Sequence, residues 1–207
     1  MHTVFELARK IGIGGPRAAN FPMQADYRET DFSALAGKSV LALGDWENLT
    51  YSGRQCFQGA EPDARLLLDK LKQEALWVTA IGFACVPSDS IGMAQSYFQS
   101  AGWKAHLNPQ EHVTDQECSR VLANSDSQIL MHAGALIASS RCDAVMVFSG
   151  DGSLVNDIAR YTARLPKKRL VYTCSVPGST SNRILATNNP FVHGNVFIQQ
   201  DVLTNAG

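Results

Sequence analysis

Acidic side chains follow two of the most apolar segments of this 207-residue chain. Asp45 comes directly after residues 39–44, and Asp151 lies in the turn after residues 144–148. A third acid, Asp126, opens a segment with apolar residues at helical spacing. Carboxylate oxygens are ligands that Mg²⁺ and Mn²⁺ prefer, and such an ion offsets the repulsion between clustered carboxylates. These three acids therefore predict a divalent-metal site, which could activate water for attack on a phosphate.

The neighbours of these acids could bind a substrate or could serve only the local fold. Asn48, three residues after Asp45, could orient that acid or a phosphate through its amide. The glycines around Asp151 could let the backbone approach a substrate closely. Acids at strand ends also often cap the next helix, and Asp126 could be only such a cap. The combination of three acids, more than any single one, favours the metal site.

Aromatic and basic residues near the acids indicate how a nucleic acid could bind. Trp46 could stack on an unpaired base, or it could pack against the sheet. Arg183, in a polar run after residues 170–174, is placed to contact a phosphate. A further basic group consists of Arg160, Arg164, Lys167, Lys168 and Arg169. Cations suit the C-terminal end of a helix, and this end should lie far from the acids, so we expect this group to be mainly structural.

Short apolar runs alternate with helical patterns from residue 38 onward. We expect strands at 39–44, 76–85, 103–107, 144–148, 170–174 and 195–199, and helices at 62–73, 90–101, 126–137 and 154–165. Such alternation is typical of βαβ units. It predicts an α/β fold, a three-layer α/β/α sandwich with a mainly parallel central sheet. Ligands of such sheets bind outside the carboxyl ends of the strands, where Asp45 and Asp151 are expected.

Composition and length exclude several classes of protein. With 18 Lys and Arg against 19 Asp and Glu, and 45% hydrophobic residues, the chain is neither disordered nor generically basic. The five cysteines are an odd number without a CxxC pair, which favours a reducing compartment over a disulfide framework. No signal peptide or 18-residue apolar run is present, so we expect a cytoplasmic protein with no membrane partner. We expect residues 1–37 to be an N-terminal extension and residues 38–207 the domain.

The motifs at the strand ends resemble those of the NYN family of PIN-like metal-dependent ribonucleases. Asp45 and Asn48 match an Asp-x-x-Asn run, and residues 142–155, CDAVMVFSGDGSLV, match the family's strand and Ser-Gly-Asp turn. The spacing from Asp126 to Asp143 also agrees, and the resemblance covers roughly residues 38–197. It implies a PIN-like, Rossmann-like fold and a Mg²⁺- or Mn²⁺-dependent endoribonuclease that hydrolyses RNA phosphodiester bonds. The expected partner is single-stranded RNA, and a homodimer is a possible assembly.

Two positions depart from the family pattern. Ser153 replaces the second acid of the turn, and His132 replaces the acid expected six residues beyond Asp126. Ser153 could contact substrate or offer a neutral oxygen, and a nitrogen ligand from His132 would favour Mn²⁺. His132 could equally be a core histidine. Asp157, one helical turn after Ser153, could replace a missing acid or lie on a solvated face.

Because two acids are missing, two alternatives to a ribonuclease stay open. The domain could be a catalytically impaired module that binds RNA or a protein partner. It could also hydrolyse a small nucleotide, since carboxylate–metal sites on this class of fold are not restricted to polymers. A deep closed pocket is expected for the small nucleotide, and an open groove for RNA.

Overall fold

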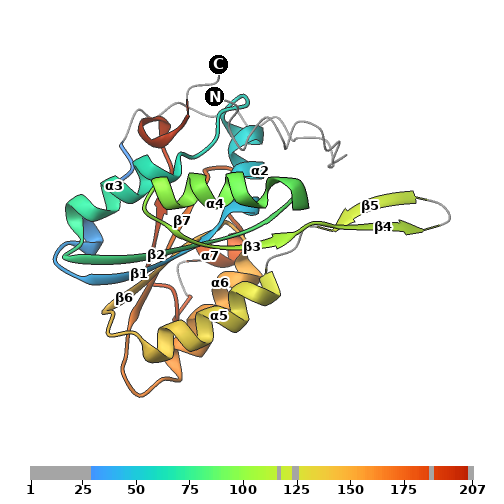
Figure 1. Ribbon diagram of the computed structural model, residues 1–207. Helices are drawn as coiled ribbons and strands as arrows, with labels where there is room; N and C mark the ends of the chain where they lie inside the picture. The colour runs from blue at the N-terminus through green and yellow to red at the C-terminus, as the bar shows by residue number, and fades with distance from the viewer. Residues whose placement is uncertain (1–28, 116–117, 123–125, 187–188, 205–207) are drawn as a thin grey trace.

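The central feature of the computed structural model, which describes residues 29–115, 118–122, 126–186 and 189–204, is a six-stranded sheet (Figure 1). Its strands are β1 (Ser39–Asp45), β2 (Trp77–Val86), β3 (Lys104–Pro109), β6 (Ala144–Phe148), β7 (Leu170–Ser175) and β8 (Gly194–Phe197). They lie in the order β3-β2-β1-β6-β7-β8, and every neighbouring pair is parallel. All six strands lie within a few residues of the positions that the sequence predicts.

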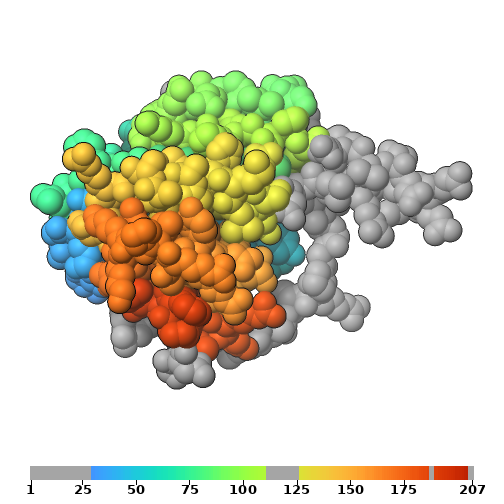
Figure 2. Space-filling view, turned by 90° about the horizontal axis from the view of Figure 1, so that it is seen from below, coloured from blue at the N-terminus to red at the C-terminus, as the bar shows by residue number. Residues whose placement is uncertain are grey.

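Helices cover both faces of the sheet. The helices α3 (Ala64–Glu74) and α4 (Ile91–Ser100) lie on one face, where α2 (Trp46–Cys56) adds to the same apolar cluster. On the other face lie α5 (Asp126–Ser139) and α6 (Gly152–Ala163), side by side in Figure 2. The central strands β1 and β6 are therefore buried on both faces, which explains their continuous apolar sequences. This arrangement confirms the three-layer α/β/α sandwich.

Helix α2 and an antiparallel hairpin were not expected from the sequence. Helix α2 follows β1 without a loop, and the short helix α7 (Asn182–Leu185) follows β7. Strands β4 (Glu111–Asp115) and β5 (Cys118–Leu122) form an antiparallel hairpin that projects away from the sheet (Figure 1). The sequence between these two strands, Gln116-Glu117, lacks the Asn-Gly or Asp-Gly pair that identifies most tight hairpins.

The domain begins before residue 38. Phe32 and Leu35 are fully buried, and the ring of Phe32 packs on that of Phe148 at a centroid distance of 6.1 Å. Near the opposite end of the chain, Asp201 accepts hydrogen bonds from the backbone N–H and the hydroxyl of Thr30. The predicted boundary at residue 37 is therefore wrong, because residues 30–37 belong to the domain. Residues 1–28 of the expected extension lie outside the described residues.

Trp46 is a core residue. Its side chain is 5% exposed, and its ring packs against Phe98 and edge-on against Trp103, at centroid distances of 5.5 and 5.3 Å. The indole lies over Gly44 and Gly82, where an added Cβ would come within 2.8 and 2.7 Å of its Nε1 atom. The prediction that Trp46 stacks on a base is therefore wrong, and the alternative, packing against the sheet, is the one observed.

This packing predicts that Gly82→Ala destabilises the domain. The added methyl group would displace the indole of Trp46, and overpacking of this kind lowers the free energy of unfolding by about 1–3 kcal/mol. Urea unfolding followed by tryptophan fluorescence measures the change. Gly92→Ala in α4 is the matched control, because its Cβ would meet no atom within 4 Å. It should leave stability unchanged or raise it by up to about 1 kcal/mol. Equal effects of the two substitutions would contradict the packing described for Trp46.

Candidate acidic site at the carboxyl edge of the sheet

The predicted acids gather where the order of the strands reverses. The chain crosses from β1 to β2 on one side, and β6 lies against β1 on the other side. Open α/β sheets bind ligands in the crevice at this switch point. Asp45 ends β1, and Ser149 follows β6 in the position beside it, since Gly44 pairs with Phe148. Ser149 Oγ donates a hydrogen bond of 2.9 Å to Asp45 Oδ2.

Asp45 is a buried carboxylate that titrates near neutral pH. It is 4% exposed, and its Oδ1 atom accepts a hydrogen bond of 3.3 Å from the backbone N–H of Asn48. Through this bond Asp45 caps α2. Burial raises its pKa to about 7, and the negative charges of Asp126 and Glu47 act in the same direction. The hydrogen bonds from Ser149 and Asn48 oppose this rise in pKa without cancelling it. Asp45 is thus suited to gain or lose a proton under physiological conditions.

Asp151 caps the helix that follows β6. Its Oδ1 atom accepts hydrogen bonds of 2.6 Å from the N–H of Ser153 and 3.2 Å from that of Leu154. Its own N–H donates to Ser149 Oγ at 3.1 Å, so the Ser149 hydroxyl links Asp151 to Asp45. The Oδ2 atom of Asp151, by contrast, accepts no hydrogen bond from the described residues. Both strand-end acids are helix caps, as the structural alternative predicted, but Asp151 keeps one oxygen available for a ligand.

Asn48 joins the two halves of the site. Its Oδ1 atom accepts a hydrogen bond of 2.8 Å from the N–H of Gly150. The side-chain N–H₂ group of Asn48 donates to no described residue, so it can still donate to a phosphate oxygen. Its predicted role in orienting Asp45 is filled by its backbone N–H instead.

The glycines of the turn admit another segment of the chain. A Cβ on Gly152 would lie 2.4 Å from Ser181 Oγ, and one on Gly150 would lie 3.2 Å from the carbonyl oxygen of Ser179. The N–H of Ser181 donates to the Gly150 carbonyl at 3.0 Å. We expected these glycines to let a substrate approach. In the structure they let the polar segment before α7 close against the turn.

Asp126 lies in the first turn of α5, and its charge interacts with both other acids. Burial raises its pKa, as does the charge of Asp151, while the charge of Asp126 in turn raises the pKa of Asp45. The structure therefore brings the three predicted acids to one edge of the sheet. Within the described ranges, however, no group of three His, Cys, Asp or Glu side chains could hold a metal ion.

Without a cluster of three ligands, this edge of the sheet could hold a divalent ion only through few protein ligands. Asp45 is 4% exposed and accepts a hydrogen bond on each oxygen, so little of its carboxylate is open to an ion. Mg²⁺ in proteins commonly binds one or two carboxylates and keeps several waters. Asp126 and the Oδ2 atom of Asp151 would be the carboxylates that hold such an ion. Its charge would offset that of Asp151, which adds to the effect of burial in raising the pKa of Asp126.

The two optional metal ligands lie in other surroundings. The ring of His132 is 4.4 Å from that of His106 and 5.9 Å from that of Phe83, as in the core-histidine alternative. Asp157 is exposed on α6 and forms no hydrogen bond or ion pair with the described residues. Neither His132 nor Asp157 therefore has a described contact with Asp45, Asp126 or Asp151.

The basic residues divide into one group near the site and one far from it. Arg183 donates from Nη1 to Ser153 Oγ at 3.2 Å, which places its guanidinium beside the turn that Asp151 caps. Arg169 is 8% exposed and donates to the carbonyl of Ser140, and Lys167 donates to that of Arg141. Arg169 and Lys167 thus stabilise loops at the opposite edge of the sheet, as we expected for this basic group.

The sequence alone did not identify the roles of Ser149 and Glu47. Ser149 was visible only as part of the SGDGS run, yet its hydroxyl connects the two strand-end acids. Glu47, next to Trp46 in the DWEN run, accepts a hydrogen bond from the N–H of Cys85 and raises the pKa of Asp45. The only feature of the sequence that could have indicated a role for Glu47 was its position two residues after the end of β1.

The raised pKa of Asp45 predicts that Asp45→Asn stabilises the domain at high pH. The folded protein holds the Asp45 proton more tightly than the unfolded chain, so this group's contribution to stability is lost as the pH rises from about 4 to about 7. Asparagine stays neutral, and its amide can still pair with Asn48 and Ser149. In the absence of divalent ions, the variant should be more stable than the native protein by roughly 2–4 kcal/mol at pH 8 and nearly equal at pH 4. Urea unfolding at both pH values measures this, and a difference independent of pH would show that Asp45 does not titrate in this range.

Comparisons with known proteins support the fold and do not bear on the activity. No protein-family model matches the sequence, and no curated protein matches it. The structure is similar to a crystal structure of a protein of unknown function from Vibrio parahaemolyticus, with a TM-score of 0.66 and 21% identity over 81% of this chain and 97% of that chain. Within the described part of the chain, no helix is long and apolar enough to cross a membrane. At this identity the similarity supports the α/β/α fold alone, and the NYN resemblance stays a prediction.

Proposed function

We propose that this domain is a divalent-metal-dependent endoribonuclease of the NYN type that hydrolyses phosphodiester bonds in single-stranded RNA. One observation carries this proposal. Asp45, Asp126 and Asp151 come from separate elements and meet at the switch point of the sheet, where burial raises the pKa values of Asp45 and Asp126 and the charge of a neighbouring acid adds to each rise. Carboxylates rarely gather in this way without a cation or a proton to offset their charge.

In this proposal the chain's own groups hold the ion, orient the phosphate and move a proton. Asp126 and the Oδ2 atom of Asp151 would hold Mg²⁺ or Mn²⁺, which supplies a water of lowered pKa and offsets phosphate charge. Asp45, whose pKa burial raises to about 7 in the ion-free protein, would exchange a proton at its carboxylate. The amide N–H₂ of Asn48 and the guanidinium of Arg183 would donate to phosphate oxygens, and Ser153 would hold that guanidinium in place.

A catalytically impaired module that binds RNA or a protein partner is the second candidate. The hydrogen bonds on both oxygens of Asp45 favour it, since they leave that acid without a direct place in an ion's shell. The composition and cysteine pattern support a cytoplasmic location for either candidate. The homodimer stays a prediction.

The proposal predicts that Asp151→Asn abolishes cleavage while the fold persists. An asparagine oxygen can still accept from the N–H groups of Ser153 and Leu154, so the cap of α6 is kept. Loss of one charged group that stabilises a transition state lowers kcat by at least about 100-fold. The measurement is cleavage of labelled single-stranded RNA in Mn²⁺, Mg²⁺ or EDTA.

The matched control is Asp143→Asn. Asp143 precedes β6, at the other end of the strand from the acids, where it accepts from the N–H of Ser39 and pairs with Lys167. This variant should cleave like the native protein. Cleavage that survives Asp151→Asn, or that persists in EDTA, would refute the metal-dependent mechanism. A native protein that binds RNA but cleaves nothing with any divalent ion would identify the binding module.

A further inference from the structure

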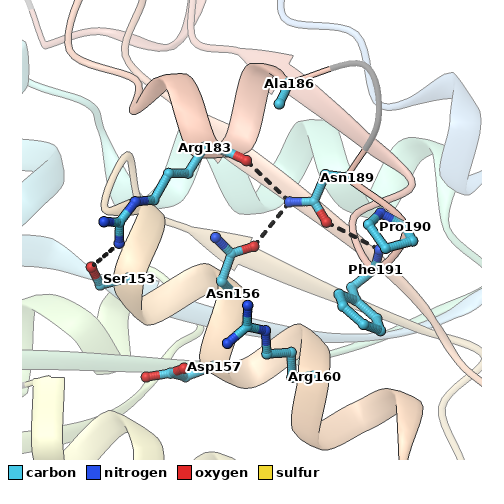
Figure 3. A pocket seen from close by; sticks show the side chains of 9 residues that line it. All are labelled: Ser153, Asn156, Asp157, Arg160, Arg183, Ala186, Asn189, Pro190 and Phe191. Carbon is cyan, nitrogen blue, oxygen red and sulfur yellow. Dashed lines mark hydrogen bonds between the residues drawn. The ribbon is translucent and has the colours of Figure 1, made fainter.

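A pocket of about 580 Å³ lies beside the acidic site, between α6, α7 and the segment before β8 (Figure 3). It falls within the size range of small-molecule sites. Its lining residues are Ser153, Asn156, Asp157, Arg160, Arg183, Ala186, Asn189, Pro190 and Phe191. Ser153 and Arg183, which neighbour Asp151, form the end of the pocket nearest the acids.

Asn189 fixes the polar wall of this pocket. Its side-chain nitrogen donates to Asn156 Oδ1 at 2.9 Å and to the carbonyl of Arg183 at 3.0 Å, and its oxygen accepts from the N–H of Phe191 at 3.0 Å. The amide of Asn189 is therefore fully used. Because Asn156 accepts through its oxygen, its N–H₂ group is the part left to donate, and it donates to no described residue.

Two guanidinium groups add to this donor surface. In Figure 3 the guanidinium of Arg160 points toward Asn156, whereas the carboxylate of Asp157 points away from it. Arg160 forms no ion pair or hydrogen bond with the described residues, although Asp157 is only three positions earlier on α6. Within the described residues, the guanidinium of Arg183 donates one hydrogen bond, to Ser153. The polar groups that remain available are mainly donors, so the complementary ligand is rich in acceptors and negatively charged.

The rest of the lining is apolar. Ala186, Pro190 and Phe191 form it, and the half-buried ring of Phe191 offers a surface for a flat group. Arginine binds phosphate oxygens through paired N–H groups, and nucleic-acid bases stack on aromatic rings. A ligand that satisfies both walls carries a phosphate and a planar ring.

We propose that this pocket binds a nucleoside monophosphate unit, with its phosphate at Arg160 and Arg183 and its base against Phe191. The unit could belong to an RNA strand or be a free nucleotide. If the unit belongs to an RNA strand, the pocket is the subsite for a nucleotide that flanks the cleaved bond, and this assignment rests on the proposed function.

Calorimetric titration of the full chain in EDTA tests this assignment. The probes are uridine 5′-monophosphate, uridine and a uridine hexaribonucleotide. The native protein should bind the monophosphate saturably and uridine more weakly. Arg160→Gln should weaken binding of the monophosphate by about 10-fold, the usual scale for a hydrogen bond to a charged group. Asn156→Asp, which replaces the donor with a negative charge at constant shape, should weaken it at least as much.

Arg164→Gln is the matched control, because Arg164 is exposed at the end of the same helix and does not line the pocket. It should change affinity by less than about 2-fold, since surface charges contribute little. Absence of saturable binding of both phosphate-containing probes, or equal losses in Arg160→Gln and Arg164→Gln, would overturn the proposal. Tighter binding of the hexamer than of the monophosphate identifies an RNA subsite, and the reverse identifies a free-nucleotide site.

The pocket and the ribonuclease proposal can fail separately. Binding in EDTA does not require a metal ion, and Asp151→Asn should bind the monophosphate like the native protein. If cleavage is absent but binding depends on Arg160, the pocket stands and the ribonuclease proposal fails. If cleavage depends on Asp151 but no phosphate-containing probe binds, the pocket assignment fails alone.

Discussion

A single hydroxyl group, that of Ser149, joins the two strand ends on which the site is built. It donates to the buried carboxylate of Asp45 and accepts from the N–H of Asp151. A buried carboxylate is strongly unfavourable without partners, so the position of Asp45 depends on this bond and on its cap bond to Asn48. Asn48 also accepts from Gly150, so a second hydrogen bond links α2 to the turn after β6.

Helix capping and ligand binding are compatible at these strand ends. A carboxylate has two oxygens, and a helix cap needs only one of them. Asp151 gives its Oδ1 atom to α6 and keeps Oδ2, whereas Asp45 gives one oxygen to α2 and the other to Ser149. Two acids with the same place in the sequence pattern therefore have different chemistry. The open acid is suited to a ligand, and the enclosed acid is suited to a proton.

Much of the fold could be predicted because a strand that is buried on both faces of a sheet has a continuous apolar sequence. The strands β1 and β6 are continuous apolar runs, so their positions and the acids that follow them were clear. Helix α2 was missed because few of its residues are apolar, and the burial of Trp46 depends on Gly82, which lies in another strand. Residues 45–48 alone could not show which way the indole of Trp46 points.

The pocket was beyond sequence reasoning for a different reason. Its polar wall depends on the contact between Asn156 and Asn189, which are 33 positions apart and carry no motif. Ser153 and Asp157 were considered only as metal or substrate contacts. The spacing of the basic residues did not separate Arg160, which lines the pocket, from Arg169, which supports a loop.

Helix α6 sets the distance between the acidic site and the pocket. Asp151 caps its first turn, and Arg160 lies more than two turns later, roughly 13 Å along the axis at 1.5 Å per residue. A helix of this kind is stiff, and its buried face, which includes Val155, Ile158 and Ala159, holds it against the sheet. A ligand held at Arg160 therefore cannot draw the acids toward itself. A phosphate held by Arg160 alone would lie far from the acids, whereas one that also contacts Arg183 would lie at the end of the pocket nearest to them. A strand that occupies both the pocket and the acidic site would therefore pass the Arg183 end of the pocket.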